Sequence, residues 1–327
     1  MKKRLMFFAL AAIGMASCNG GYKQLDSGIS YKIADDKSGA AIKEGDFIAF
    51  NFVIKNDADS VMQSSYEKGM PTVQFMPPTK GKGNIMAVFA NLSEGDSVVI
   101  KQNIDSLTKG RPRPKELKGK YIEYCVKVVK VIAKSGVTDQ VFNDHYKDYI
   151  KSLSDAAKAK EPADIKKYIA DNKLKVTTTA SGLDYVITTP GSGPNAINGD
   201  TVVVNYVGKF LNGKVFDTNI KSEAVAGKLP INPMNPYKPI RFALGAPGMI
   251  GGWSEAFLLF NKGTKASIIV PSSLGYGEQG NQIMGPYTPM YFDVELVDIV
   301  KPDPNAPKPA QPVLPGAQPA PTDAKKK

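Results

Sequence analysis

Residues 181–187 read Ser-Gly-Leu-Asp-Tyr-Val-Ile, and this stretch decides the fold because residues 27–33, Ser-Gly-Ile-Ser-Tyr-Lys-Ile, resemble it. At the same offset of 154 residues, the Gly-Asp pair at 45–46 matches the Gly-Asp pair at 199–200. Further along the chain the offset grows to 168 residues, so the later copy carries extra sequence. Such self-similarity indicates that one structural unit occurs twice.

Each copy has the pattern of a β-sheet with one short helix. Residues 201–207 are β-branched and aromatic and lie between the turn signals Asn-Gly-Asp and Asn-Gly, which is typical of a strand. Residues 291–299 alternate between apolar and polar side chains from Phe292 onward. A helical stretch over 253–260 follows Gly251-Gly252 and interrupts the strands. The fold class predicted is therefore α+β, with an antiparallel sheet wrapped around a short helix in each copy.

A helical linker joins the two copies. Phe142, Tyr146 and Tyr149 recur at spacings of three and four, and Thr138 is suited to cap the start of the helix. A second helix is expected from near Pro162 to Asn172, because proline ends or kinks a helix. The apolar face is suited to dock on either sheet or to pair with a second subunit, so a homodimer through this helix is one expectation. His145, on the same face, is interpreted as a packed or interface residue and not as a catalyst.

These observations give a complete domain plan. We expect a lipoprotein signal peptide at 1–17, a tether at 18–26, a degenerate copy at 27–133, the linker at 134–173, an intact copy at 174–300 and a tail at 301–327. The extra residues of the second copy are assigned to an exposed loop at 221–238, which is rich in Pro, Asn and Lys. The tail is Pro-rich and basic and is predicted to be disordered, because it cannot bury enough apolar surface.

The N-terminus has the pattern of an export signal. A basic start at residues 2–4 is followed by an apolar stretch over 5–14, which is too short to span a bilayer. Met15-Ala16-Ser17-Cys18 resembles the lipobox of bacterial lipoproteins, which implies cleavage before Cys18 and acylation of that residue. The alternative is a plain signal peptide with an incidental cysteine. Lipidation would attach the protein to a membrane, because more than one acyl chain gives stable anchoring.

The composition excludes several classes of protein. The 327 residues are 42% hydrophobic, which is ordinary for about two globular domains. One histidine and two cysteines argue against a multi-histidine or thiolate metal site, and we expect neither metal nor cofactor. The formal charge is +11, but the excess is scattered and no basic stripe is interleaved with stacking aromatics. The sequence therefore does not favour binding to nucleic acid.

Several separated motifs of the second copy, over about residues 182–300, resemble the FKBP-type peptidyl-prolyl cis-trans isomerases. Tyr206 precedes the segment Asn212–Thr218, which ends in Val-Phe-Asp-Thr. Phe-Ala-Leu-Gly at 242–245 leads to Met-Ile-Gly-Gly-Trp at 249–253, and Leu-Gly-Tyr-Gly follows at 274–277. The resemblance implies two FKBP-like domains, a degenerate one followed by an intact one, and rotation about Xaa-Pro bonds as the reaction.

The resemblance also implies which residues form the site. Trp253 would be the floor for the proline ring, and the Ile250 amide and the Tyr276 hydroxyl would donate to carbonyls beside the proline. The catalytic set implied is Tyr206, Phe216, Asp217, Trp253, Tyr276 and Phe292. The substrate-binding set implied is Phe242, Met249, Ile250, Ile283 and Met284, of which the last two occupy the loop that covers the site. Asp217 is expected either to act on the amide electrostatically or to position Tyr206, and no arginine is an obvious partner for it.

The first copy lacks these groups. Phe52 stands where the second copy has Tyr206, and Met62-Gln63 stands where it has Phe216-Asp217. Ile85 falls opposite Trp253, and no residue of the segment 105–110 corresponds to Tyr276. We expect an inactive domain, which leaves binding of extended or unfolded polypeptide as a possible role for it.

Two functions from different classes follow. The first is a lipid-anchored peptidyl-prolyl isomerase that assists the folding of exported, proline-containing polypeptides. It would lie in the cell envelope, at the outer membrane facing the periplasm, because Asn19 and not Asp follows Cys18. The alternative is a non-catalytic chaperone or assembly subunit that binds polypeptide through its FKBP-like domains.

Overall fold

The computed structural model describes residues 21–79, 84–109, 111–114, 117–231 and 234–302. These residues belong to two compact units. The first unit comprises Met1–Lys167 and Tyr276–Thr288, and the second comprises Tyr168–Gly275 and Pro289–Lys327. The lipidation residue Cys18 and the tail beyond residue 302 lie outside the described residues. Within the described ranges, no helix combines the length and the apolar character needed to cross a bilayer.

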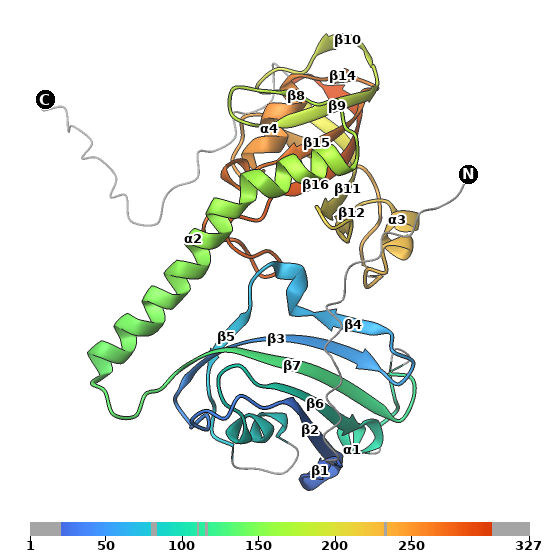
Figure 1. The fold of residues 1–327 in the computed structure, drawn as a ribbon. Coiled ribbons are helices and arrows are strands. Elements are labelled where there is room, and N and C mark those ends of the chain that lie inside the picture. The colour runs from blue at the N-terminus through green and yellow to red at the C-terminus, as the bar shows by residue number, and fades with distance from the viewer. Residues whose placement is uncertain (1–20, 80–83, 110, 115–116, 232–233, 303–327) are drawn as a thin grey trace, which may run out of the picture. The chain divides into compact units, whose positions relative to one another are not determined.

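The first unit contains an antiparallel sheet (Figure 1). Its order is β1-β2-β6-β7-β3-β4, and β5 also pairs with β3. The strands are β1 (Lys23–Gln24), β2 (Ile29–Asp35), β3 (Phe47–Asn56), β4 (Val61–Ser64), β5 (Thr72–Phe75), β6 (Ser97–Asn103) and β7 (Tyr121–Ile132). Short helices connect them: η1 (Asp26–Gly28), η2 (Ser65–Lys68), η3 (Ile85–Asn91) and α1 (Ile104–Thr108).

The core of the first unit lies between its sheet and η3. Val88 and Phe89 of this 3-10 helix are buried and belong to the same apolar cluster as the inward residues of the sheet. The ring of Phe89 meets that of Phe50 edge to face, with centroids 5.0 Å apart. The predicted sheet around a short helix is therefore present, although this helix is a seven-residue 3-10 helix, a form that occurs mainly in short pieces.

The linker is one helix, α2 (Asp139–Asp171), and the expectation of a separate helix from Pro162 was wrong. Proline in a helix interior removes one hydrogen bond, here the one to the carbonyl of Lys158. The helix nevertheless continues through Pro162, and an ion pair lies across it, with Lys160 Nζ 2.9 Å from Asp164 Oδ2. Lys151 and Asp155 form a second pair one turn apart.

Within the first unit, the apolar face of α2 docks on the sheet. Phe142 is buried together with Phe47, and Tyr146 stacks on the Phe47 ring with centroids 5.6 Å apart. Thr138 Oγ1 accepts a hydrogen bond from the amide of Val141, as its predicted capping role requires. Within the second unit, Tyr168 near the end of α2 packs against Tyr291, at 5.5 Å between ring centroids.

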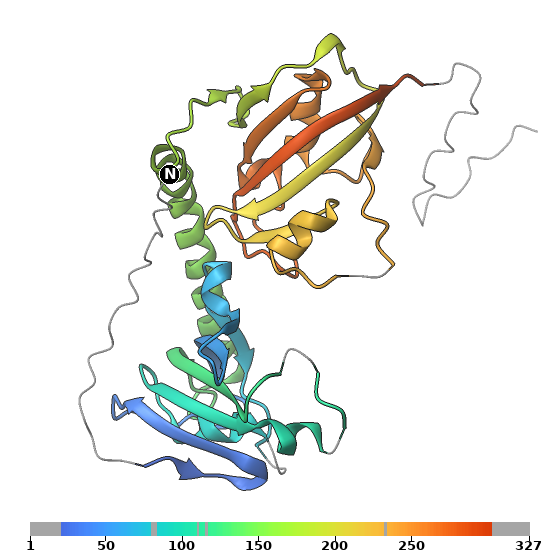
Figure 2. The same ribbon diagram turned by 90° about the vertical axis from the view of Figure 1, so that its right-hand side faces the viewer.

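The second unit repeats the same sheet with one further small ladder. Its order is β12-β11-β16-β15-β9-β8, β13 also pairs with β11, and β10 pairs with β14. The strands are β8 (Thr177–Thr178), β9 (Asp184–Thr189), β10 (Ser192–Asn195), β11 (Thr201–Phe210), β12 (Val215–Thr218), β13 (Ile240–Ala243), β14 (Asn261–Lys262), β15 (Lys265–Val270) and β16 (Met290–Val300). The helices are α3 (Lys221–Ala226), α4 (Gly251–Leu258) and η4 (Ser272–Leu274). Figure 2 shows β11 in yellow beside β16 in red, the longest ladder of this sheet.

The register of the two sheets confirms that the units are copies. Asn205 lies opposite Glu295 in the second unit, and Asn51 lies opposite Lys127 in the first. Both ladders shift register by one residue at the same place, between Val203 and Val204 of β11 and between Ala49 and Phe50 of β3. The α+β fold class, with an antiparallel sheet around a short helix in each domain and a helical linker, is therefore confirmed. The extra segment of the second copy is not all loop, because its first residues form α3.

Candidate active site

Trp253 lies in the first turn of α4, where Gly252 allows the helix to sit close to the sheet. A Cβ atom on Gly252 would lie 2.5 Å from a side-chain carbon of Val270, so only glycine fits at this position. Trp253 is 3% exposed, and its indole nitrogen has no hydrogen-bond partner among the described residues. The sequence predicts α4 well, although the helix begins and ends two residues earlier than expected.

Aromatic rings surround this indole. Tyr206 meets it edge to face at 5.0 Å between centroids, and Phe292 does so at 5.3 Å. Phe242 lies 5.8 Å away at an interplanar angle of 40°, and Phe257 of the same helix lies at 5.7 Å. The structure thus brings together the predicted Tyr206, Phe242, Trp253 and Phe292. Because the indole is nearly covered, its access to a proline ring stays a prediction.

Phe216 extends the aromatic cluster from β12. Its ring meets that of Phe292 edge to face, at 5.6 Å and 87°. Gly208 on β11 makes room for this contact, since a Cβ there would lie 2.7 Å from the Phe216 ring and 2.9 Å from the Phe292 ring. Gly208 is paired with Asp217 on one side and with Phe292 on the other. Sequence reasoning did not assign a role to this glycine.

The Tyr206 hydroxyl donates a 2.6 Å hydrogen bond to Asp217 Oδ2. The Asp217 side chain is exposed, and within the described residues it forms no ion pair with an arginine or a lysine. The carboxylate therefore faces solvent and holds one ring of the aromatic cluster. This contact fits the positioning role considered for Asp217.

Asn219 is a buried residue of this site that sequence reasoning missed. Its Oδ1 accepts the amide hydrogen of Tyr206 at 2.8 Å, and its Nδ2 donates to the carbonyls of Val204 and Lys238 at 3.1 and 3.0 Å. The side chain thus joins β11 to the segment before β13. Its only sequence signal is its place directly after the Phe-Asp-Thr segment, and its backbone partners could not be read from the sequence.

Ile250 lies at the N-cap of α4, with Met249 before it, and both are half-buried. Among the described residues no group accepts a hydrogen bond from the Ile250 amide. Amides at a helix N-terminus lack partners within the helix and are suited to bind an acceptor. This geometry fits the predicted use of the amide as a donor to a substrate carbonyl.

Tyr276, Ile283 and Met284 belong to the segment Tyr276–Thr288, which groups with the first unit. Tyr276 is 42% exposed, Ile283 is exposed and Met284 is buried. In the part of the chain that the structure describes, the Tyr276 hydroxyl has no hydrogen-bond partner. Because this segment groups with the first unit, its place relative to the cluster around Trp253 stays a prediction.

The corresponding place in the first unit is filled differently. Ile54 stands where the second unit has Gly208, because Ile54 is paired with Gln63 as Gly208 is with Asp217. Phe52 carries no hydroxyl to bond Gln63, although its amide is held by Ser65 Oγ at 2.8 Å. The framework of the site survives there without its polar pair and with isoleucine in place of the glycine.

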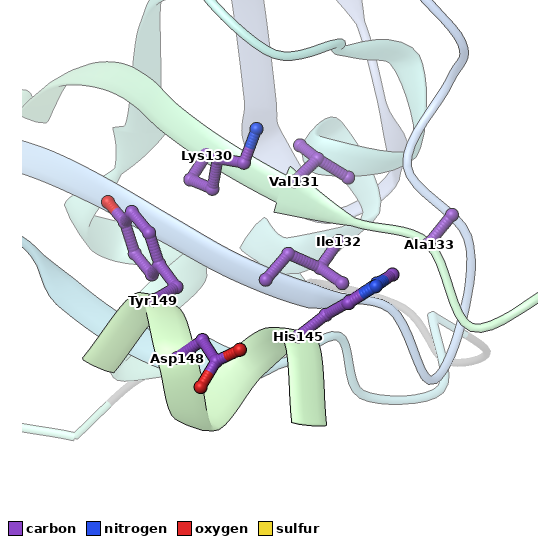
Figure 3. A pocket seen from close by; sticks show the side chains of 7 residues that line it. All are labelled: Lys130, Val131, Ile132, Ala133, His145, Asp148 and Tyr149. Atoms are coloured by element: carbon purple, nitrogen blue, oxygen red, sulfur yellow. The ribbon is translucent and has the colours of Figure 1, made fainter. Parts of the chain in front are cut away.

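Of two cavities in the described residues, one lies away from the aromatic cluster and the other borders it at Tyr206. One, of about 410 Å³, is lined by the end of β7 and by α2, and Figure 3 shows His145, Asp148 and Tyr149 of the helix beside it. His145 is exposed there and is not packed in a core. The other cavity, of about 200 Å³, includes Tyr206 and charged residues such as Lys265 and Glu295, but not Trp253. Within the described residues no three His, Cys, Asp or Glu side chains gather as a metal ion would require.

Residues 193–297 match the family model of the FKBP-type peptidyl-prolyl cis-trans isomerases. The chain is 37% identical over 179 residues to a probable FKBP-type peptidyl-prolyl cis-trans isomerase FkpA of Neisseria meningitidis, covering 54% of this chain and 56% of that protein. It is 32% identical over 186 residues to FkpA of Escherichia coli K12, covering 53% of this chain and 61% of that protein. The chain therefore spans little more than half the length of these relatives.

Two of the solved structures that match this chain are a bacterial FkpA and a plant protein with three FKBP domains. The crystal structure of Escherichia coli FkpA matches 51% of this chain and 76% of its own, with 29% identity and a TM-score of 0.35. The three FKBP domains of wheat FKBP73 match 86% of this chain at 15% identity, with a TM-score of 0.31.

Proposed function

We propose that this chain, whose residues 193–297 belong to the FKBP-type peptidyl-prolyl cis-trans isomerase family, catalyses rotation about Xaa-Pro bonds with an active site in its second domain. The observation that carries the proposal is the aromatic cluster around Trp253, tied to Asp217 by the Tyr206 hydroxyl. The first domain lacks this arrangement, so activity is assigned to the second alone.

Such a site suits the reaction because amide rotation needs no nucleophile. The barrier of about 18–20 kcal/mol arises from resonance in the C–N bond, which is lost when the bond twists. Water hydrogen bonds stabilise the planar, polar amide. A dry aromatic site withdraws them and is complementary to the twisted form, which lowers the barrier. Trp253, Phe216 and Phe292 would supply this surface.

The polar groups would orient the substrate chain. The Ile250 amide has no partner within the described residues and is suited to a carbonyl beside the proline. The Tyr276 hydroxyl would donate to a second carbonyl when its segment covers the site. Asp217 would hold the Tyr206 ring in place.

An assay on the full chain tests this function. Exchange at an Ala-Pro bond of a short peptide is followed by NMR, with Asp217→Ala and Tyr276→Phe as variants. Acceleration that both variants reduce supports the proposal. Uncatalysed exchange takes about 10–100 s and is the reference rate. If the wild-type chain does not accelerate exchange above this rate, the proposal is wrong.

The substrates proposed are unfolded or exported polypeptides that contain proline, and the place proposed is the cell envelope. A lipid anchor on Cys18 would hold the protein at the outer membrane, facing the periplasm. Support comes from the lipobox-like sequence before Cys18 and from Asn19 after it. Cys18→Ser is expected to move the protein from the membrane fraction to the soluble fraction. Retention of this variant in the membrane would exclude the anchor.

Pairing of two chains through α2 is a weaker part of the proposal. The aromatic residues that suggested it, Phe142 and Tyr146, pack against Phe47 of the same chain. A dimer would therefore have to use the exposed residues Val141 and Ile150. Sedimentation of the full chain and of Ile150→Lys tests this contact.

The alternative function, polypeptide binding without turnover, is supported by the first domain, which keeps the fold without the polar pair. A holdase assay with a proline-free client separates the two functions. Protection that persists in Asp217→Ala would favour binding as an activity of its own.

A further inference from the structure

The strand β4 of the first unit is an open sheet edge. Within the described residues it ends the strand order and is paired with β3 alone. On the free side of an edge strand, backbone N–H and C=O groups lack a partner and can pair with another extended chain. The three residues Val61, Met62 and Gln63 are all exposed.

Two features that protect edge strands, charged residues and proline, are missing from this edge, although the strand is only four residues long and its ladder with β3 shifts register once. Proteins place charged residues or proline there to prevent pairing with other chains. The sequence of β4 is Val-Met-Gln-Ser, without charge or proline. Val61 is 54% exposed and Met62 is 40% exposed, and the neighbouring Tyr66 of η2 is 58% exposed. Large apolar side chains therefore stand beside unpaired backbone groups.

The second unit shows what the same strand looks like when it is covered. β12 corresponds to β4, and α3 packs against it. Val215 and Thr218 of β12 are buried, whereas Val61 and Ser64 at the two ends of β4 are not. The first copy has no counterpart of α3 after its strand, since Ser65–Lys68 form a single 3-10 turn.

From these contacts we propose that β4 binds an extended apolar segment of a non-native polypeptide, by adding it as a further strand to the sheet of the first unit. Backbone hydrogen bonds would give affinity without regard to sequence, and Val61, Met62 and Tyr66 would contact apolar side chains of the segment. This site is distinct from the isomerase site and does not require proline in the bound segment.

A second copy of the chain is a poorer occupant. Pairing of β4 with its own copy would join only four residues from each side, Val61–Ser64. A stable interface between proteins buries at least about 1,200 Å². Four residues from each side bury far less area than this. Such a small contact suits weak and reversible binding of an unfolded chain.

The test uses the full chain and a fluorescein-labelled, proline-free peptide of eight alternating threonine and valine residues, followed by fluorescence anisotropy. Val61→Lys places a charge on the open edge and is expected to weaken binding about tenfold, which corresponds to about 1.4 kcal/mol. Val129→Lys is the matched control, because Val129 is 38% exposed on β7, which has partners on both sides.

A second peptide tests the hydrogen bonds themselves. Methylation of alternate backbone nitrogens removes the donors on one edge of the peptide and leaves its side chains unchanged. Weaker binding of this peptide to the wild-type chain supports strand addition. Equal binding of both peptides, equal binding by Val61→Lys, or no binding by the wild-type chain overturns the proposal.

Two further readouts keep the alternatives apart. Isomerase activity of Val61→Lys should equal that of the wild type. The peptide-binding test does not depend on isomerase activity, so the two proposals can fail separately. Sedimentation of the wild type should not change with Val61→Lys. A self-association that this substitution abolishes would mean that β4 is a subunit interface, and the proposal would be wrong.

Discussion

The hydroxyl of Tyr206 and the carboxylate of Asp217 are joined by a hydrogen bond of 2.6 Å across the ladder of β11 and β12. Tyr206 in turn meets the Trp253 indole at 5.0 Å. Asp217 is therefore linked to Trp253 through one aromatic ring. This chain of contacts makes its role testable by a pair of substitutions.

Asp217→Ala and Tyr206→Phe are expected to lower the isomerase rate by similar factors, about tenfold each, as loss of about 1.4 kcal/mol of transition-state stabilisation requires. The double variant should lose no more than either single one, because both changes remove the same bond. NMR exchange rates of the four proteins give the coupling directly. If the fold-loss in rate of the double variant equals the product of the two single fold-losses, Asp217 acts on the substrate independently of Tyr206.

Gly208→Ala is expected to displace the Phe216 ring. The added methyl group would lie 2.7 Å from Phe216 and 2.9 Å from Phe292, which is closer than side chains pack. Overpacking of this kind costs about 1–3 kcal/mol. Urea unfolding should show the loss, together with a fall in activity.

Gly251→Ala is the matched control for that substitution. A Cβ on Gly251 would lie 3.6 Å from its nearest neighbour, an ordinary contact distance. Its stability should change by less than about 0.5 kcal/mol. Equal stability of Gly208→Ala and the wild type would show that the Phe216 ring has room to move.

The sequence predicts the strands and the short helix of each domain well, because local patterns of apolar and turn residues indicate them. The alternation over 291–299 and the residues before Trp253 predict β16 and α4 to within two residues at each end. The correspondence of Gln63 with Asp217 was also predictable from the same offset, and the register agrees, because Gln63 is paired with Ile54 as Asp217 is with Gly208. Each of these predictions uses only residues that are close together in the sequence.

The errors have a common physical cause, which is stabilisation by contacts distant in sequence. Pro162 suggests a helix end, but α2 is continuous and packs on strands distant in sequence, with Tyr146 against Phe47 and Tyr168 against Tyr291. Asn219 looks like an ordinary turn residue until its amide is seen to bond three separate groups. The prolines that follow Lys221–Ala226 also concealed the short helix α3.

Asn219→Ala is expected to cost about 1–3 kcal/mol of stability, because it leaves the buried amide of Tyr206 and the carbonyl of Val204 without partners. Asn219→Ser should cost less, since Ser65 holds the equivalent amide of Phe52 in the first domain. If Asn219→Ser lowers the isomerase rate while the free energy of unfolding changes little, Asn219 is a positioning residue for Tyr206. Equal unfolding midpoints for Asn219→Ala and the wild type would contradict the role.

Asp293 makes the stability of the second domain depend on pH. Burial by itself raises the pKa of this carboxyl, but hydrogen bonds from Lys209, Tyr291 and Ser267 outweigh it and hold the pKa below its usual value. Because the pKa is lower in the folded than in the unfolded state, the stabilisation is present above about pH 4 and is lost as the pH falls through the folded-state value. The wild type should therefore be more stable than Asp293→Asn at pH 6, and the gap should narrow below about pH 4. Urea midpoints of the wild type and Asp293→Asn, measured from neutral to acidic pH, give this difference in stability. In a Lys209→Gln background, Asp293→Asn should cost less stability over the same pH range, because the charge that holds the carboxylate is gone. A gap that stays constant with pH would mean that Asp293 contributes through packing and not through its charge.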